Sequence, residues 1–354
     1  MKPKPSRSSR PANWLRIAAA SLVGALAPLN GLVAQSPWET LNVGTTASFR
    51  GLSVVDDRVV WASGTRGTVI HTIDGGGSWT VDSIPNGVAF DLRGIHARND
   101  RVAHVAATAG RIWRTTDGGK TWSLRYQAAD TSMFLDAIVF VNDRVGMALG
   151  DPMGGRFVLL VTRDGGDTWA EAPTGSRPEA MDGEAAFAAS GTSLVFAGQR
   201  HGWLGTGGSV ARVFRTMDAG ASWSVSSSAI PGRGGSAGVF SVAFADSLRG
   251  IVVGGDYQLP DSATSTAAFT TDGGATWQPS GTFPRGFRSG VAVRQRRDEL
   301  IAIAVGTTGS DISRDGGRTW SPLDGTAFNA IQFAPSGVAY AVGARGRVAR
   351  HVVR

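Results

Sequence analysis

Short apolar stretches alternate with turn-forming residues along most of the chain. In the first complete unit the apolar stretches cover residues 51–55, 59–62 and 67–71, and a fourth, residues 80–84, follows Trp79. Stretches of four to six residues, separated by Gly, Asp and Ser, are typical of β-strands joined by tight turns. The pattern predicts an antiparallel unit of four strands, A to D in chain order, and residues 240–244 and 250–253 begin a similar unit.

The predicted turn between strands C and D carries a repeated motif, Ser/Thr-x-Asp-x-Gly-x-Ser/Thr-Trp. Six copies occur, with aspartates at Asp74, Asp117, Asp164, Asp218, Asp272 and Asp315. In such a turn Asp accepts backbone N–H bonds and Gly adopts positive φ, so we expect these six aspartates to be structural. The Trp is expected to bury its ring between neighbouring sheets, with its N–H available to a partner. Units of about 40–45 residues with four strands are propeller blades.

The number of blades follows from the two ends of the chain. After the last motif, residues 330–334, 338–342 and 347–351 provide strands A, B and C, and no strand D follows them. Residues 37–41 look like the tail of another motif, a Trp followed by an outer strand. We therefore predict an all-β, seven-bladed propeller of four-stranded antiparallel blades, closed by the N-terminal strand.

The first 34 residues differ from the rest. They contain five basic residues and no acid, and an apolar stretch runs from residue 17 to 34, interrupted by Pro28 and Asn30. This composition indicates a Sec-type signal peptide over residues 1–34, followed by one propeller domain over 35–354, in a periplasmic or extracellular protein. An uncleaved anchor is the alternative, but the apolar stretch is broken and short for a span.

Charge and cysteine content restrict the function classes. The formal charge of +7 comes largely from the leader, because the remainder has 30 Lys and Arg against 28 Asp and Glu. Nucleic-acid binding is therefore not expected. The chain has no cysteine, and its five histidines show no metal-ligand spacing, so we expect no metal and no cofactor. We expect no transmembrane segment in the mature chain, and a monomer.

The repeated motif resembles the Asp-box, or BNR, repeat of bacterial sialidases and sortilin-type receptors. With seven blades and a leader, the chain is most similar to the bacterial family related to the photosystem II stability/assembly factor. That resemblance covers nearly the whole mature chain and implies a non-catalytic assembly role. The motif itself specifies architecture rather than activity.

Strand alternation predicts two faces for the ring. The A–B and C–D turns lie on one face, which we call the Asp-box face, and the B–C and D–A connections lie on the opposite face. The starts of the A strands were assigned to residues 49–50, 91–93, 135–136, 184–185, 240–241, 287–288 and 328–329. Extended B–C loops are expected at 199–209, with Trp203 exposed, and at 256–265. Loops lengthened over a rigid ring often form binding sites.

These placements predict a bipolar pocket on the opposite face. The candidate ligand-binding residues are Arg50, Arg93, Asp136, Asp151, Glu184, Arg200, Asp256, Tyr257 and Arg288. The Arg side suits a carboxylate or phosphate, and the acidic side suits hydroxyls or a base. Alternatively, these charges pair with one another and have only a structural role.

Two functions are compatible with such a pocket. The favoured one is a non-catalytic scaffold that binds a protein, peptide or glycan. The alternative is a sialidase-like exo-glycoside hydrolase, for which residues 49–52 resemble the Phe-Arg-Ile-Pro start of sialidases but lack Ile-Pro. That resemblance implies Arg50, Arg200 and Arg288 as the Arg cluster, Tyr257 as nucleophile with Glu184 as its partner, and Asp136 or Asp151 as the acid.

Overall fold

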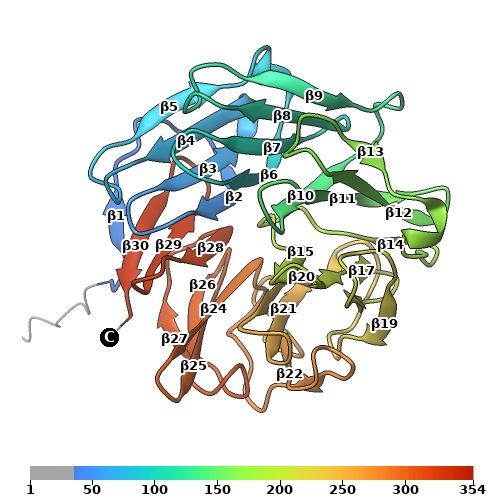
Figure 1. The fold of residues 1–354 in the computed structure, drawn as a ribbon. Helices are drawn as coiled ribbons and strands as arrows, with labels where there is room; N and C mark the ends of the chain where they lie inside the picture. The colour runs from blue at the N-terminus through green and yellow to red at the C-terminus, as the bar shows by residue number, and fades with distance from the viewer. Residues whose placement is uncertain (1–35, 354) are drawn as a thin grey trace, which may run out of the picture. The chain divides into compact units, whose positions relative to one another are not determined.

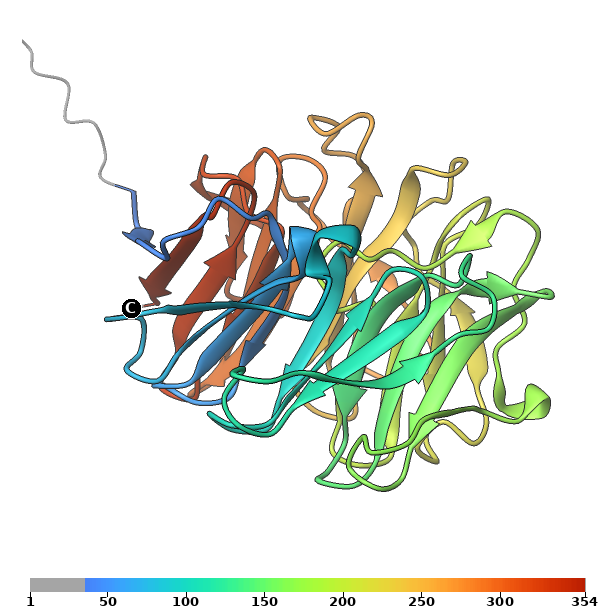
Figure 2. The same ribbon diagram turned by 90° about the horizontal axis from the view of Figure 1, so that it is seen from above.

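Seven four-stranded sheets form a closed ring. The computed structural model describes residues 36–353, so the predicted signal peptide lies outside the described residues. The chain passes around the ring in sequence order, from blue to red in Figure 1, and Figure 2 shows its two faces from the side. Each regular blade is an antiparallel meander with consecutive strands paired. The predicted fold is confirmed.

The strands of the first three blades match the predicted pattern. Blade 1 consists of β2 (Phe49–Val54), β3 (Val60–Gly64), β4 (Thr68–Thr72) and β5 (Thr80–Ser83). Blade 2 consists of β6 (Leu92–Ala97), β7 (Ala103–Ala107), β8 (Arg111–Thr115) and β9 (Ser123–Gln127). Blade 3 consists of β10 (Leu135–Phe140), β11 (Gly146–Met153), β12 (Arg156–Thr162) and β13 (Ala170–Glu171). Three short 3-10 helices lie in connections, η1 (Thr65–Gly67), η2 (Gly87–Ala89) and η3 (Thr174–Ser176).

The remaining four blades complete the ring. Blade 4 consists of β15 (Leu194–Ala197), β16 (His201–Gly205), β18 (Arg212–Thr216) and β19 (Ser224–Ser227). Blade 5 consists of β20 (Ala237–Phe244), β21 (Gly250–Asp256), β22 (Ala267–Thr270) and β23 (Gln278–Pro279). Blade 6 consists of β24 (Gly290–Arg296), β25 (Glu299–Gly306), β26 (Gly309–Ser313) and β27 (Ser321–Asp324). Blade 7 consists of β28 (Ala330–Phe333), β29 (Val338–Val342), β30 (Val348–Val352) and the N-terminal β1 (Glu39–Leu41).

Ring closure joins the two ends of the described chain. Strand β1 pairs antiparallel with β30, with Glu39 opposite Arg350, and the two side chains form an ion pair. Trp38 is buried, and its indole Nε1 donates to Ser310 Oγ of blade 6 at 3.2 Å. The N-terminal strand therefore satisfies the edge that the C-terminal strand would otherwise leave open.

All six Asp boxes have one hydrogen-bonding pattern. In the second box Asp117 Oδ1 accepts from the Thr121 N–H at 2.9 Å and from Thr115 Oγ1 at 2.9 Å, while Oδ2 accepts from Thr121 Oγ1. These bonds, the Thr121 hydroxyl first, lower the pKa of Asp117 to about 2. Both carboxylate oxygens are occupied within the turn. Among the described residues, the indole N–H groups of the six box tryptophans have no hydrogen-bond partner.

Four pairs of neighbouring blades are joined by a polar aromatic side chain on strand B. The indoles of Trp61 and Trp203 donate to the carbonyls of Asn99 and Gly273 in the next blade, at 3.2 and 2.7 Å. At the matching position His104 Nε2 contacts Gly165 O at 3.1 Å, and the Tyr340 hydroxyl contacts Gly75 O at 2.9 Å. Since each contact satisfies a carbonyl group and fills the space between sheets, these side chains fix how adjacent blades pack.

Blade 4 departs from the sequence prediction. Its innermost strand is β15, whereas Glu184 and Ala185 form the short strand β14, which pairs with β17 (Gly207–Gly208) and extends the sheet of blade 5. The extra length of this unit therefore precedes strand A and does not lie in a long B–C loop. Trp203, predicted to be exposed, is 1% exposed because it is the strand-B side chain that joins blades 4 and 5.

The extra residues of blade 4 enter the central channel. Residues 186–193, which we call the channel segment, contact blade 5 through Thr192, whose carbonyl accepts from the Val242 N–H at 3.0 Å. On the other side, a Cβ placed on Gly191 would lie 3.4 Å from the Arg93 carbonyl and 3.9 Å from the Gly51 Cα. The segment therefore crosses from blade 5 to the innermost strands of blades 1 and 2.

Candidate functional site

Four blades place a bulged residue at the start of the innermost strand, toward the opposite face. The strand registers shift between Phe49 and Gly51 and at the matching points of blades 2, 3 and 5. The bulged residues are Arg50, Arg93, Asp136 and Phe240. A bulge re-aims its side chain relative to the regular ladder, and bulges are frequent beside functional sites. These four positions form what we call the channel ring.

The two arginines of the channel ring differ in their partners. Arg93 donates to Asp91 Oδ2 at 2.7 Å, and its guanidinium lies 5.4 Å from the centre of the Phe134 ring. Arg50 makes no hydrogen bond or ion pair with any residue from 36 to 353. Burial lowers the pKa of Arg50, and the charge of Arg93 adds to that effect. The charge of Asp91 acts in the opposite direction, so Arg50 is a partly buried cation that has a counter-charge nearby but no direct hydrogen bond or ion pair in the described chain.

Asp136 is a buried carboxyl rather than an exposed acid. It is 1% exposed, and its Oδ2 has no hydrogen-bond partner among the described residues. Burial raises the pKa of Asp136 well above its usual value, and the nearby Asp151 raises it further. Asp151 Oδ1 accepts from the Ala186 N–H at 3.1 Å, at the start of the channel segment. On the acidic side of the ring, burial therefore favours the uncharged form of Asp136.

Arg288 does not belong to the channel ring. Its Nε donates to Asp311 Oδ2 at 2.7 Å, and both side chains are buried. The strand pairs of blades 1 and 6 can be aligned, because Val291 pairs with Ala304 in blade 6 as Leu52 pairs with Ala62 in blade 1. In this alignment Arg288 corresponds to the buried Phe49 and not to Arg50. The sequence assignment was shifted by one residue, and a one-residue shift in a strand exchanges the two faces.

Glu184 is also neutralised inside the protein. Its carboxylate accepts from the guanidinium of Arg212 and from Thr206 Oγ1 at 2.5 Å, and its side chain is fully buried. A third bond comes from the Met181 N–H at 2.9 Å. Both oxygens are therefore occupied, and Glu184 has the structural role that was the alternative to ligand binding.

Arg200 lies on the Asp-box face. It follows β15 in the A–B turn of blade 4, and its Nε donates to Met217 O, beside the fourth Asp box, at 3.2 Å. The placement of Arg200 in a B–C loop was therefore wrong, because the true strand A begins ten residues after Glu184.

Asp256 and Tyr257 begin the extended B–C loop of blade 5, as predicted. Asp256 Oδ1 accepts from the Gln258 N–H at 2.9 Å and shapes the turn. Tyr257 is 48% exposed, and its ring lies 6.1 Å from that of Phe240. Phe240 also stacks on Phe187 of the channel segment at 3.8 Å and meets Phe287 edge-on at 4.7 Å. The sequence reasoning missed this aromatic cluster because Phe187 reaches it only through the insertion of blade 4.

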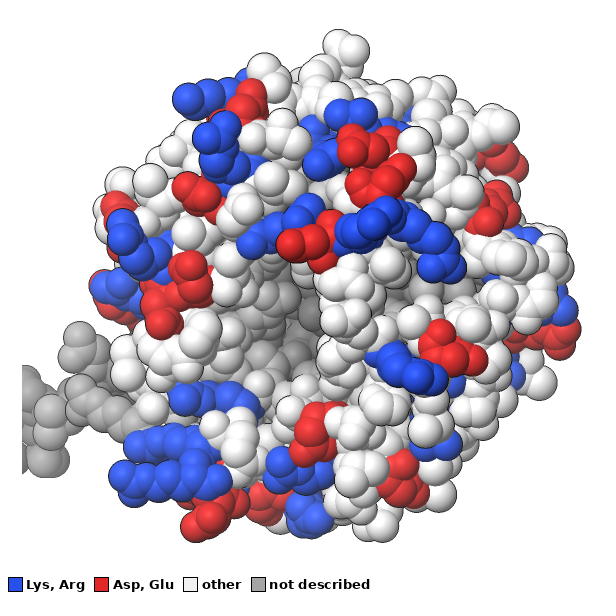
Figure 3. All heavy atoms as spheres, in the orientation of Figure 1, with Lys and Arg blue, Asp and Glu red and all other residues white. Residues whose placement is uncertain are grey.

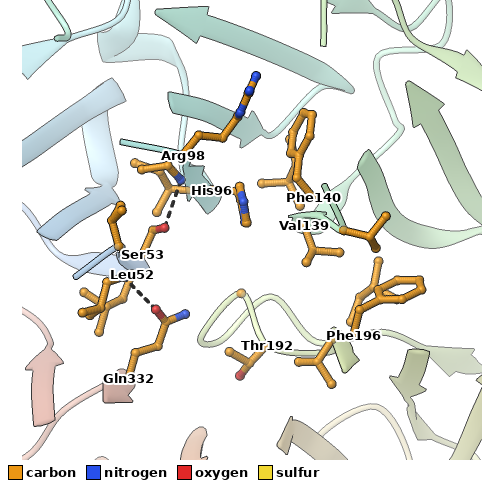
Figure 4. A pocket seen from close by; sticks show the side chains of 18 of the residues that line it. Leu52, Ser53, His96, Arg98, Val139, Phe140, Thr192, Phe196 and Gln332 are labelled. Carbon is orange, nitrogen blue, oxygen red and sulfur yellow. Dashed lines mark hydrogen bonds between the residues drawn. The ribbon is translucent and has the colours of Figure 1, made fainter. Parts of the chain in front are cut away.

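A cavity of about 510 Å³ occupies the channel between its innermost strands. Figure 3 shows the ring hollowed at its centre, and Figure 4 shows side chains from several blades around the space. Its wall includes Ser53, His96, Arg98, Phe196 and Gln332. Gln332 Oε1 accepts from the Val54 N–H at 2.8 Å, and Arg98 pairs with Asp143 at 2.7 Å. This cavity includes A–B turn residues and so opens toward the Asp-box face, where no site was predicted.

Two other properties concern the described part of the chain only. Between residues 36 and 353 no group of three or more His, Asp or Glu side chains is placed to hold a metal ion. No helix in this part is long and apolar enough to cross a membrane.

Comparisons with known proteins agree with the architecture. The model of the BNR/Asp-box repeat matches residues 113–124 and 311–322. No curated protein sequence matches the chain. The structure of YCF48 bound to D1 peptide has 18% identity and a TM-score of 0.61, and the match covers 91% of this chain and 97% of that one. YCF48 from Cyanidioschyzon merolae has 18% identity and a TM-score of 0.59, with 89% and 98% coverage.

The same fold also occurs in an enzyme. The streptogramin B lyase structure has 12% identity and a TM-score of 0.59, covering 88% of this chain and 96% of that one. At these identities the likeness concerns the fold and leaves the activity open. The chain is a seven-bladed propeller of BNR/Asp-box repeats whose fold is similar to that of YCF48.

Proposed function

We propose that this protein is an exported, non-catalytic scaffold that binds an acidic peptide or protein segment on the opposite face. Arg50 carries the proposal, since it is a partly buried cation on the channel ring with no direct hydrogen bond or ion pair in the described chain. A carboxylate from a ligand would supply the charge-assisted hydrogen bonds that Arg50 lacks. The likeness to YCF48 bound to D1 peptide supports a peptide as ligand.

The aromatic cluster, which reaches the surface at Tyr257, supplies the second half of such a site. Tyr257 and Phe187 flank Phe240, which occupies the channel-ring position of blade 5. Aromatic side chains with one accessible edge are common anchors in protein interfaces. A peptide that places an acidic group on Arg50 and an apolar group near Tyr257 would use the two kinds of contact that this face provides.

The geometry favours this function over the sialidase-like alternative. That chemistry needs a Tyr nucleophile in hydrogen-bond contact with a Glu. Here both oxygens of Glu184 are bonded to other groups, and Tyr257 makes ring contacts with Phe240 and Phe287. Two further members of the Arg cluster are not available on this face: Arg200 lies on the Asp-box face, and Arg288 is in a buried ion pair with Asp311.

Affinity capture with residues 35–354 tests the proposal. Binding partners from native periplasm and membranes are expected to be retained by wild type and by Arg144→Ala, an exposed control in the A–B turn of blade 3. Arg50→Gln and Tyr257→Ser are expected to lose them. Equal recovery with Arg50→Gln would contradict the proposed site. Hydrolysis of fluorogenic sialosides or other glycosides that Tyr257→Phe abolishes would replace the scaffold with the hydrolase.

Export is part of the same proposal. It rests on the basic start and apolar stretch of residues 1–34, which lie outside the described residues. N-terminal sequencing of the protein recovered from intact cells is expected to begin near Gln35. A mature protein that retains Met1 in the cytoplasm would contradict export.

A further inference from the structure

The junction between blades 3 and 4 has an aliphatic side chain at the joining position of strand B, as do the junctions after blades 5 and 6, which have Ile251 and Ile303. In blade 3 this position holds Met147, where blades 1, 2 and 4 have Trp61, His104 and Trp203. Met147 packs against the fourth Asp box, since a Cβ on Gly220 would lie 2.5 Å from its Cε. A thioether provides no N–H for the carbonyl of the next blade and fills less space than an indole.

An open groove lies at this junction. It has a volume of about 790 Å³ and runs from Phe196 at the channel, past Met147, to Trp169 and Pro173 on the outer side of blade 3. It shares Val141, Asn142 and Phe196 with the channel cavity, so the two spaces adjoin. A groove of this kind, open from the centre of the ring to its edge, accommodates an extended chain better than a compact molecule.

The floor of the groove is apolar and its rim is basic. Met147, Val161 and Phe196 contribute apolar surface. On the rim, Arg163 is exposed and makes no hydrogen bond or ion pair within residues 36–353, and Arg200 uses only its Nε, on the Met217 carbonyl. The positive charge available to a ligand is therefore carried by two arginines that lie across the groove.

The acids of the groove are already engaged. Asp218 accepts hydrogen bonds from the Thr216 hydroxyl and from the N–H and hydroxyl of Ser222. Glu171 accepts from Arg177 at 2.8 Å. Few acceptor groups therefore remain for sugar hydroxyls, whereas donors remain for carboxylates. Charge complementarity favours an acidic partner.

We propose that the groove between blades 3 and 4 is a second binding site, which takes an extended acidic peptide segment. An apolar side chain of that segment occupies the space beside Met147 and Trp169, and acidic side chains on either side of it contact Arg163 and Arg200. The site is independent of the channel ring, because it lies on the Asp-box face, and it can be tested separately from Arg50.

Selection from a phage-displayed library of short random peptides tests this site. The wild-type domain is expected to enrich sequences with a large apolar residue flanked by Asp or Glu. Arg200→Ala is expected to weaken the enriched peptides about tenfold, the effect of losing one charge-assisted hydrogen bond. Arg58→Ala is the matched control, since Arg58 Nε donates to Ile73 O beside the first Asp box at 3.2 Å, as Arg200 does beside the fourth.

Filling the groove provides the second arm. Met147→Trp places an indole between blades 3 and 4, at the position that Trp203 has between blades 4 and 5. We expect this variant to fold and to lose peptide binding. If that variant does not fold, the double substitution Arg163→Ala and Arg200→Ala tests the same surface without changing the core. Failure to enrich acidic peptides, or peptides that bind Arg200→Ala as well as they bind Arg58→Ala, would overturn the proposal. Peptides lost on Arg50→Gln but retained by the groove variants would assign binding to the opposite face instead.

Discussion

The buried Arg288–Asp311 pair provides the sharpest test of the site assignment. Arg288 is fully buried, and its guanidinium donates to Asp311, to the Phe287 carbonyl and to Thr308 Oγ1. Asp311→Asn would leave that buried guanidinium without its counter-charge. Breaking one partner of a buried ion pair costs about 3–5 kcal/mol, so we expect a loss of that size in the free energy of unfolding.

The rest of the ring shows which residues would replace the pair. In blade 1 the two corresponding positions hold Phe49 and Ile70, both buried in one apolar cluster. The double substitution Arg288→Phe and Asp311→Ile copies that arrangement into blade 6. Replacing a buried ion pair by apolar residues of suitable size is often neutral or stabilising by about 1–4 kcal/mol. We therefore expect the double variant to be at least as stable as wild type.

Denaturant unfolding followed by tryptophan fluorescence measures both changes, and the chain has 11 tryptophans. Arg288→Phe alone is the third member of the cycle and reports the cost of leaving Asp311 with the half-exposed Arg285 as its remaining ion-pair partner. A loss below about 1 kcal/mol for Asp311→Asn would refute the buried pair. If the double variant is as unstable as Asp311→Asn, Arg288 does not occupy the position that Phe49 has in blade 1. If the double variant is stable but no longer binds peptide, Arg288 belongs to the binding site after all.

Three further outcomes follow from the structure. Trp38→Ala is expected to lower the free energy of unfolding by about 3–5 kcal/mol, because the buried indole contacts Phe328 with ring centres 4.9 Å apart, and calorimetry checks this. Burial lowers the pKa of His104 to about 3, so its neutral form stabilises the fold above about pH 6.5, and stability should fall by up to about 1.4 kcal/mol per pH unit below that value. His104→Trp should reduce this slope in unfolding curves at pH 7 and pH 5, and an unchanged slope would contradict the assignment. Asp136→Asn should leave stability at pH 7 unchanged or increase it, since the buried carboxyl has a raised pKa, whereas a large loss in thermal unfolding would show that its charge is required.

Much of the fold could be predicted because its determinants are local. Each Asp box is a short motif whose Asp, Gly and hydroxyl residues satisfy one another within the turn, as Asp117 does with Thr115 and Thr121. Six such turns at regular spacing define the blades, and Trp38 with its following strand defines the seventh. The extended loop at Asp256 was also found from the sequence, because its length stands out against the repeat.

The faces of individual side chains could not be predicted with the same accuracy. Arg288 looks like Arg50 in a Phe-Arg dipeptide, yet it occupies the position of Phe49, since the bulges that set strand register leave no clear mark in the sequence. Blade 4 was misread because the apolar residues after Glu184 resemble a strand, although they cross the channel instead.

The sequence by itself determined the structural role of the Asp boxes, since that role depends on contacts within a few residues. It also determined the number of blades and the way the ring closes, since the repeat shows which strand the C-terminal unit lacks and that residues 37–41 can supply it. The tertiary structure decided which charges remain available. Arg50 is left without a direct hydrogen bond or ion pair in the described chain, Arg288 and Glu184 are neutralised by residues of other strands, and Met147 leaves a groove between two blades. These properties depend on packing between segments far apart in the chain, where a shift of one residue changes the neighbour that a side chain meets.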